Sequence, residues 1–215
     1  MTGAATLRRI AGQPWLWAWA AALGVWLATE VFTGGKGGGQ VLSAALTFGA
    51  FYVIVAIGQM FVVTLGPGNV DLSIPACMTL AGTVSMKVMN GAAALILPGL
   101  GIALAVGLGV GLVNFGLIRL LRIPPIIATL SSSFIFQSAA IWYNRGLRIK
   151  PPAPLADFTT AKVLGVPVLA MVVIALAVVM HLVLTRTTYG RAVLAIGQNE
   201  DLNVEILRQQ LFNGP

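Results

Sequence analysis

Charged residues are scarce in this sequence of 215 residues. Only 9% of them are Asp, Glu, Lys or Arg, whereas a soluble domain carries about 25%. So few charges could not cover the surface of a water-soluble protein of this size. The shortage excludes a soluble enzyme and a disordered tail, because both depend on contact with water over most of the chain.

Cysteine and histidine are almost absent. The single cysteine, Cys77, allows neither an intrachain disulfide nor a cysteine-based metal cluster, which excludes a disulfide-rich secreted domain. The single histidine, His181, has no carboxylate near it in sequence, which does not favour a proton relay or a metal site. The motifs of zinc proteases, α/β-hydrolases and P-loop proteins are also missing. We therefore predict no catalytic, metal or cofactor-binding residues, although the missing motifs by themselves leave a membrane enzyme open.

Apolar residues are abundant instead. They make up 58% of the chain, and the mean hydropathy is +0.92, so a lipid bilayer is the expected partner of most of the surface. At about 20 residues per crossing, the length allows about six spans. We predict an all-α, polytopic helical membrane protein with about six transmembrane helices. Their expected positions are residues 14–32, 41–65, 74–89, 92–118, 126–143 and 167–184, with a polar extramembranous loop over 144–166.

The net charge of +7 comes from 13 basic and 6 acidic residues. The basic residues stand singly or in pairs between apolar runs, which indicates anchoring at lipid headgroups and not nucleic-acid binding. Six crossings place both termini on one side of the membrane. Arg8 and Arg9 precede the first span and Lys36 follows it, which favours a cytoplasmic N-terminus.

A break interrupts the apolar runs at residues 66–73. Pro67 lacks a donor, and Gly66 and Gly68 are conformationally loose, so a helix cannot continue there. Asp71 follows, and either Asp71 or Ser73 could cap the next helix. Two interpretations stay open: a capped turn at the membrane interface, or a discontinuous helix that lines a polar path inside the protein.

Two further patterns lie within the apolar runs. Ser133 and Gln137 stand one helical turn apart and could either bind a polar solute or bond neighbouring helices. Ala103, Gly107 and Gly111 stand four residues apart on one helix face, where another backbone could approach closely.

Three parts of the chain, in this order, resemble the permease subunits of bacterial ribose-type (monosaccharide) ATP-binding cassette importers. Residues 58–73 read GQMFVVTLGPGNVDLS and look like that family's G-x-T-x-V-x-x-x-G-G-I-D-L-S stretch. Residues 111–114, GLVN, and 122–130, RIPPIIATL, are similar to its G-x-x-N-G and R-I-P-P-F-I-A-T-L segments. Residues 188–200, TYGRAVLAIGQNE, are similar to its T-x-x-G-R-x-x-x-A-x-G-x-N-x-x-A-A region.

The resemblance implies import of a monosaccharide or a similar small polar solute across the bacterial inner membrane. The implied partners are a cytoplasmic ATP-binding cassette ATPase, a periplasmic solute-binding protein, and a second permease copy or a paralogue. Candidate solute-path residues are Gly66, Gly68, Asn69, Asp71, Ser73, Ser133 and Gln137. Candidate residues of an ATPase-coupling loop are Tyr189, Gly190, Arg191, Gly197, Asn199 and Glu200, which would place that loop and the N-terminus in the cytoplasm.

Departures from the family pattern leave alternatives open. Pro67 and Asn69 stand where the family usually shows Gly and Ile, and the likeness stops after Glu200. We therefore predict a permease domain over 1–200 and a divergent polar tail over 201–215, with about four C-terminal spans missing through truncation or a frameshift. The alternatives are a branched-chain amino-acid-type permease, which the D-L-S and R-I-P-P segments disfavour, or a truncated membrane protein that does not transport.

Overall fold

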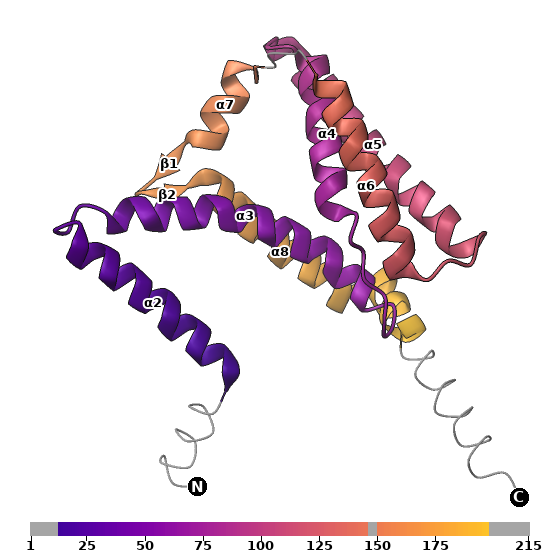
Figure 1. The fold of residues 1–215 in the computed structure, drawn as a ribbon, viewed down its shortest axis with the longest axis horizontal. Helices are drawn as coiled ribbons and strands as arrows, with labels where there is room; N and C mark the ends of the chain where they lie inside the picture. Colours follow the sequence, from indigo (N-terminus) through magenta and orange to yellow (C-terminus); the bar gives the residue numbers. More distant parts are fainter. Residues whose placement is uncertain (1–12, 146–149, 198–215) are drawn as a thin grey trace, which may run out of the picture.

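The computed structural model describes residues 13–145 and 150–197, and it is built almost entirely from helices (Figure 1). Its long helices are α2 (Pro14–Phe32), α3 (Gly38–Val63), α4 (Ile74–Met89), α5 (Ile96–Arg119), α6 (Pro125–Asn144) and α8 (Val168–Arg186). A short 3₁₀ turn, η1 (Ala93–Leu95), leads into α5. The predicted all-α fold is confirmed, because each predicted apolar segment forms a helix with nearly the predicted ends.

Four helical segments are long and apolar enough to cross a membrane: Gly38–Val63, Ala93–Arg119, Pro125–Asn144 and Val168–Arg186. The chain is therefore a multi-pass helical membrane protein. The apolar segments Leu16–Phe32 and Ile74–Met89 are shorter. The 16 residues of α4 reach only about 24 Å at 1.5 Å per residue, against a hydrocarbon core of about 30 Å. Full crossing by these two helices stays a prediction.

Proline marks the start of three of the long helices. Pro14, Pro75 and Pro125 stand in the first turns of α2, α4 and α6, where the missing N–H has no intrahelical acceptor in any case. Asn90 ends α4 in the left-handed conformation, with φ of 42°. These local signals explain why the helix ends could be predicted closely.

The connection between α6 and α8 is more regular than the polar loop that the sequence predicts. It contains α7 (Ala153–Thr160) and a hairpin of β1 (Lys162–Val163) and β2 (Val166–Pro167). Leu164 and Gly165 form its two-residue turn with φ of 51° and 81°, the positive values that such hairpin turns require. The hairpin was not predicted, because it depends on a leucine in an unusual backbone conformation.

The helices pack in two groups. One consists of α4, α5 and α6, and the other of α3 and α8 with α2 beside α3. Figure 1 shows the two groups diverging from one corner, where α3 ends, α6 begins and α8 ends. In the first group α4 and α5 approach closely where Met89, only 1% exposed, lies against Gly99. The corner is where the 66–73 break lies.

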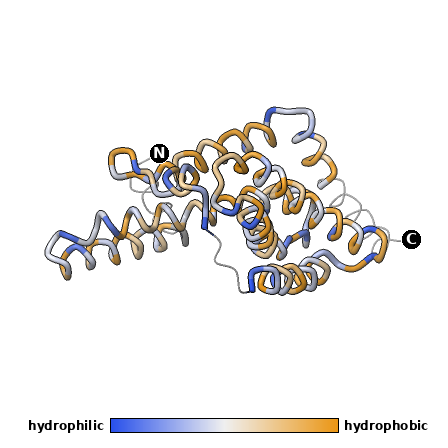
Figure 2. Tube along the Cα trace, turned by 90° about the horizontal axis from the view of Figure 1, so that it is seen from above, coloured by the Kyte–Doolittle hydropathy of each residue, from blue (hydrophilic) through white to orange (hydrophobic). Residues whose placement is uncertain are grey.

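Most of the apolar surface is open. Figure 2 shows hydrophobic residues along the helices, and only 11% to 22% of the most apolar window of the four long segments is buried. In water such faces would be unfavourable at about 25 cal/mol per Å². They fit a lipid surface or further helices packed against this part of the chain.

Candidate functional site

The 66–73 break joins α3 to α4 with an irregular backbone. Gly66 and Gly68 have φ of 133° and 83°, in the region that residues with a Cβ rarely adopt. Gly66 is buried, and Pro67 and Gly68 are exposed. The two glycines that the sequence nominates for a solute path thus set the direction of the backbone, which brings Asp71 and Ser73 inward.

Asp71 organises the start of α4. Its Oδ1 accepts from the Ser73 backbone N–H at 2.8 Å and from the Ser73 hydroxyl at 2.6 Å. Ser73 is the N-cap residue of α4, yet its own side chain makes no capping bond. Of the two capping residues that the sequence leaves open, Asp71 is the one whose carboxylate satisfies a backbone donor here.

A chain of buried polar side chains continues from Ser73 into the neighbouring helices. Asn114 of α5 donates from Nδ2 to the Ser73 hydroxyl at 2.7 Å, and Ser132 of α6 donates to Asn114 Oδ1 at 2.6 Å. The three side chains are between 1% and 5% exposed. Because a buried polar group without a partner costs about 1–3 kcal/mol, this network fixes how α4, α5 and α6 meet.

The backbone of the break is tied to its surroundings as well. The Asp71 N–H donates to Gln59 Oε1 of α3 at 3.3 Å, and the Leu72 N–H donates to Thr129 Oγ1 of α6 at 3.1 Å. In the opposite amide orientation, which satisfies both of its polar atoms, Gln59 accepts from the Asp71 N–H and donates to the Asp71 carbonyl, each at 3.2 Å. The break is thus held by side chains from both helix groups.

A cavity of about 280 Å³ lies beside the break, between α3, α5 and α6. Its polar lining comes from Asn69, Asp71, Asn114 and Thr129. The remaining lining residues are Val62, Leu65, Val70, Gly111, Phe115, Ile118 and Pro125. Among the predicted solute-path residues, only Asn69 and Asp71 line this cavity. Ser73 supports it through its bonds to Asp71 and Asn114.

The other two predicted solute-path residues lie elsewhere. The Ser133 hydroxyl donates to the Leu130 carbonyl of its own helix at 2.7 Å. Gln137 is exposed, and neither side chain lines the cavity. Within the serine run it is Ser132 that faces α5, because it lies three residues after Thr129 on the packed side of α6.

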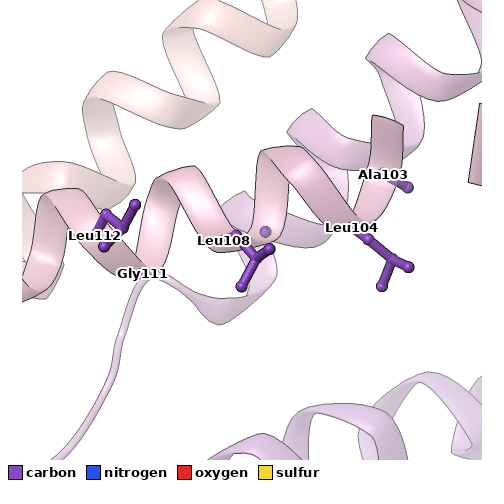
Figure 3. Close-up of a pocket in the computed structure, with 6 residues that line it drawn as sticks. Ala103, Leu104, Leu108, Gly111 and Leu112 are labelled. Carbon is purple, nitrogen blue, oxygen red and sulfur yellow. The ribbon is translucent and has the colours of Figure 1, made fainter. Parts of the chain in front are cut away.

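The small-residue face of α5 is open. Ala103, Gly107 and Gly111 line a shallow groove of about 470 Å³ on that helix. Figure 3 shows the side chains of Leu104, Leu108 and Leu112 along the same stretch. A Cβ added at Gly107 or Gly111 would meet nothing within 4 Å. The close backbone approach that the spacing allows is therefore not made within the described residues.

The predicted coupling segment forms a helix over residues 188–197 directly after α8. Tyr189 and Arg191 are exposed on it, and Gly190 and Gly197 are buried. Two further predicted residues, Asn199 and Glu200, lie outside the described residues, as does the predicted tail over 201–215. The structure therefore places four of the six coupling residues on one short helix at the corner of the fold.

The sequence pattern of the family described as "Branched-chain amino acid transport system / permease component" matches residues 41–203. The chain belongs to this permease family. The match takes in the break, the network residues and the 188–197 helix. It agrees with the resemblance to importer permeases that the motif segments carry.

Individual relatives of the permease are named as transport proteins. The fructose import permease protein of Bifidobacterium longum is 29% identical over 174 residues, covering 79% of this chain and 48% of the relative. The autoinducer 2 import system permease protein of Yersinia enterocolitica is 29% identical over 161 residues, covering 74% and 44%. The D-allose transport system permease protein of Escherichia coli is 25% identical over 150 residues, covering 69% and 45%.

The chain spans about half the length of these relatives. No solved structure matches the chain. The relatives are permease proteins and not enzymes, in keeping with the absence of catalytic motifs in the sequence.

Several residues of the candidate site were not predicted from the sequence. They are Gln59, Asn114, Thr129, Ser132 and Thr187. Asn114 and Thr129 belong to the family-like segments GLVN and RIPPIIATL, so the motifs could have nominated these two residues for the site. Thr187 stands three residues before Gly190, where the T-x-x-G pattern has its threonine. Ser132 could be told from Ser131 and Ser133 only once the packed face of α6 was known.

Proposed function

We propose that the chain is the permease subunit, or the N-terminal half of one, of an ATP-binding cassette importer that moves a monosaccharide or a similar small polar solute into the cytoplasm. One observation carries the proposal. Three family-like stretches, residues 58–73, 111–114 and 122–130, meet through Asp71, Asn114 and Thr129 around one cavity beside a helix break. Irregular backbone of this kind inside a membrane protein is tolerated where it lines a polar cavity.

The chemistry of the cavity supports a polyol. Asp71 offers acceptors, Asn69 and Asn114 offer donors and acceptors, and apolar residues complete the wall. Sugar hydroxyls both donate and accept, so they suit this set. A branched-chain amino acid carries a carboxylate, and no basic side chain lines the described cavity to pair with it. The relatives named for fructose and D-allose import point the same way.

Partners and orientation follow from the corner of the fold. The C-terminal ends of α3, α5 and α8 and the start of α6 lie there (Figure 1). The 188–197 helix also lies there, and its sequence resembles the family segment that contacts the ATPase, so we place the corner in the cytoplasm. A cytoplasmic N-terminus agrees with Arg8 and Arg9 before the first span and Lys36 after it. An ATPase would then contact the 188–197 helix, while a solute-binding protein delivers sugar from the periplasm and a second permease copy or a paralogue completes the path.

Reconstitution tests the proposal. The permease, assembled in proteoliposomes with the proposed ATPase and solute-binding protein, is expected to take up labelled monosaccharides only with ATP. Uptake of leucine in place of sugar would favour the branched-chain alternative. Flux without ATP would indicate a channel, and no flux of either solute would favour a membrane protein that does not transport.

Accessibility tests the position of the path. In a Cys77→Ala background, Asn69→Cys is expected to react with a hydrophilic methanethiosulfonate reagent much faster than Leu108→Cys. Leu108 is 72% exposed on the open face of α5 and serves as the lipid-facing control. Equal rates at the two positions would return the break to the interpretation as a simple capped turn.

A further inference from the structure

The 188–197 helix turns back sharply from α8. The Thr187 hydroxyl donates to the Val183 carbonyl at 2.5 Å and accepts from the Gly190 N–H at 3.1 Å, so it is hydrogen-bonded to both helices. A Cβ added at Gly190 would clash with the Leu184 backbone. Threonine at the cap and glycine three residues later therefore fix the direction in which the helix leaves α8.

One face of this short helix is packed against the protein. Gly190, Val193 and Gly197 are buried, at spacings of three and four residues that share a helix face. Ile196 is 54% exposed, and Arg191 is exposed as well. The helix thus has a packed side and a free side, and a partner can bind the free side without displacing the packed one.

The packed side rests on the end of α3. A Cβ added at Gly197 would clash with the Thr64 carbonyl oxygen and would lie 3.2 Å from the Leu65 carbonyl carbon. Only glycine permits this backbone-to-backbone approach. At the other end of the helix, the Tyr189 ring lies 6.3 Å from the Phe61 ring, centroid to centroid. Both contacts join residues more than 120 positions apart in sequence.

The contacted residues lead directly into the break. Thr64 and Leu65 immediately precede Gly66. Further along, Asp71 is bonded to Gln59 of α3, and Ser73 is bonded to Asn114 of α5. A displacement of the 188–197 helix against Thr64 must therefore move the end of α3 together with the break, because close-packed backbones transmit displacement.

We propose that the 188–197 helix acts directly on the 66–73 break, through the contact of Gly197 with Thr64 and Leu65, and not only through α8. Gly197 and Tyr189 are positioning residues that couple movement of this helix to the cavity at Asp71. The inference rests on the proposed function, in which an ATPase binds the free side of the helix. It adds a defined route from that surface to the candidate solute path.

Gly197→Ala tests the route in the complete permease with its ATPase and solute-binding protein in proteoliposomes. The ATPase is expected to copurify normally, because the free side is unchanged. Uptake per ATP hydrolysed is expected to fall about fivefold or more, the lower range of typical coupling factors. Gly107→Ala is the matched control, since a Cβ there meets nothing within 4 Å. An unchanged ratio in Gly197→Ala would overturn the inference, whereas absence of ATP-driven uptake in the unmodified protein would overturn the proposed function.

Cross-linking tests the same route without disturbing Gly197. Phe61→Cys and Tyr189→Cys in a Cys77→Ala background are expected to be joined by a short bismaleimide, because the two rings lie side by side. The joined protein is expected to keep ATP-driven uptake, since in the proposed route the helix and the end of α3 move together. Trp142→Cys with Tyr189→Cys is the control pair, because Trp142 lies near the far end of α6. Failure of the first pair to cross-link, or loss of uptake after cross-linking, would overturn the inference.

Discussion

Asn114 donates to the Ser73 hydroxyl at 2.7 Å across 41 positions of sequence. The same amide accepts from Ser132 at 2.6 Å, so a single side chain near the C-terminal end of α5 joins the start of α4 to α6. Its position beside a cavity lined by Asp71 makes it the central contact of the candidate site. Hydrogen bonds of this kind between membrane helices contribute modestly, about 0.6 kcal/mol each on average, but breaking one here leaves two buried hydroxyls with fewer partners.

Asn114→Ala should therefore destabilise the α4–α5–α6 group. The expected loss is about 1–3 kcal/mol, the cost of leaving buried polar groups unpaired. Thermal unfolding in detergent, followed by circular dichroism, would detect it as a lower midpoint. Gln137→Ala removes an exposed amide from α6 and is the control. Equal midpoints for the two variants would contradict the structural role of the network.

Gly99→Ala should separate α4 from α5. An added Cβ would lie 2.5 Å from both Cγ and Cε of Met89, which is only 1% exposed and has no room to move. Overpacking of this kind costs about 1–3 kcal/mol. Gly101→Ala adds the same methyl group to α5 where nothing lies within 4 Å, so it shares the gain in helix propensity without the clash.

The Gly99 clash should be relieved by Met89→Ala in a double-mutant cycle. On the Gly99→Ala background the Met89 substitution is expected to cost less than on the natural one, with an interaction energy of about 0.5–3 kcal/mol. Strict additivity of the two substitutions would show that the residues do not press on each other.

Thr187→Ala should loosen the start of the 188–197 helix. The lost cap to the Gly190 N–H is worth about 1 kcal/mol, so hydrogen–deuterium exchange over residues 187–193 should speed up about fivefold. Thr187→Ser keeps the hydroxyl and should exchange as the natural protein does. Identical exchange in the alanine and serine variants would rule out a capping role.

Impermeant maleimide labelling should reveal the orientation. In a Cys77→Ala background, Leu164→Cys in the fully exposed hairpin turn is expected to be labelled in intact spheroplasts. Arg191→Cys is expected to be labelled only after permeabilisation, because the proposed function places the 188–197 helix beside a cytoplasmic ATPase. The reverse pattern would place the N-terminus outside.

The bounds of the helices could be predicted closely from the sequence. Long apolar runs, prolines such as Pro75 and Pro125 at helix starts, and the Gly-Pro-Gly break act over a few neighbouring residues. A long apolar run in lipid forms a helix, because a helix pairs its backbone polar groups within the segment. The hairpin around Leu164 could not be read, because leucine gives no sign of a left-handed backbone. The choice of Ser132 over Ser133 depends on which side of α6 meets α5, and no local signal in the serine run records it.

By itself, the sequence determined that this protein is a multi-pass helical membrane protein, because too few charges and too many apolar residues leave lipid as the solvent. It also marked the segments that carry Asp71, Asn114, Thr129 and Gly197. Only the tertiary structure decided that Asp71, Asn114 and Thr129 meet at one cavity and that Gly197 rests on the residues leading into it. Those contacts join positions separated by tens of residues, and their geometry is set by helix packing and by the need to pair every buried polar group.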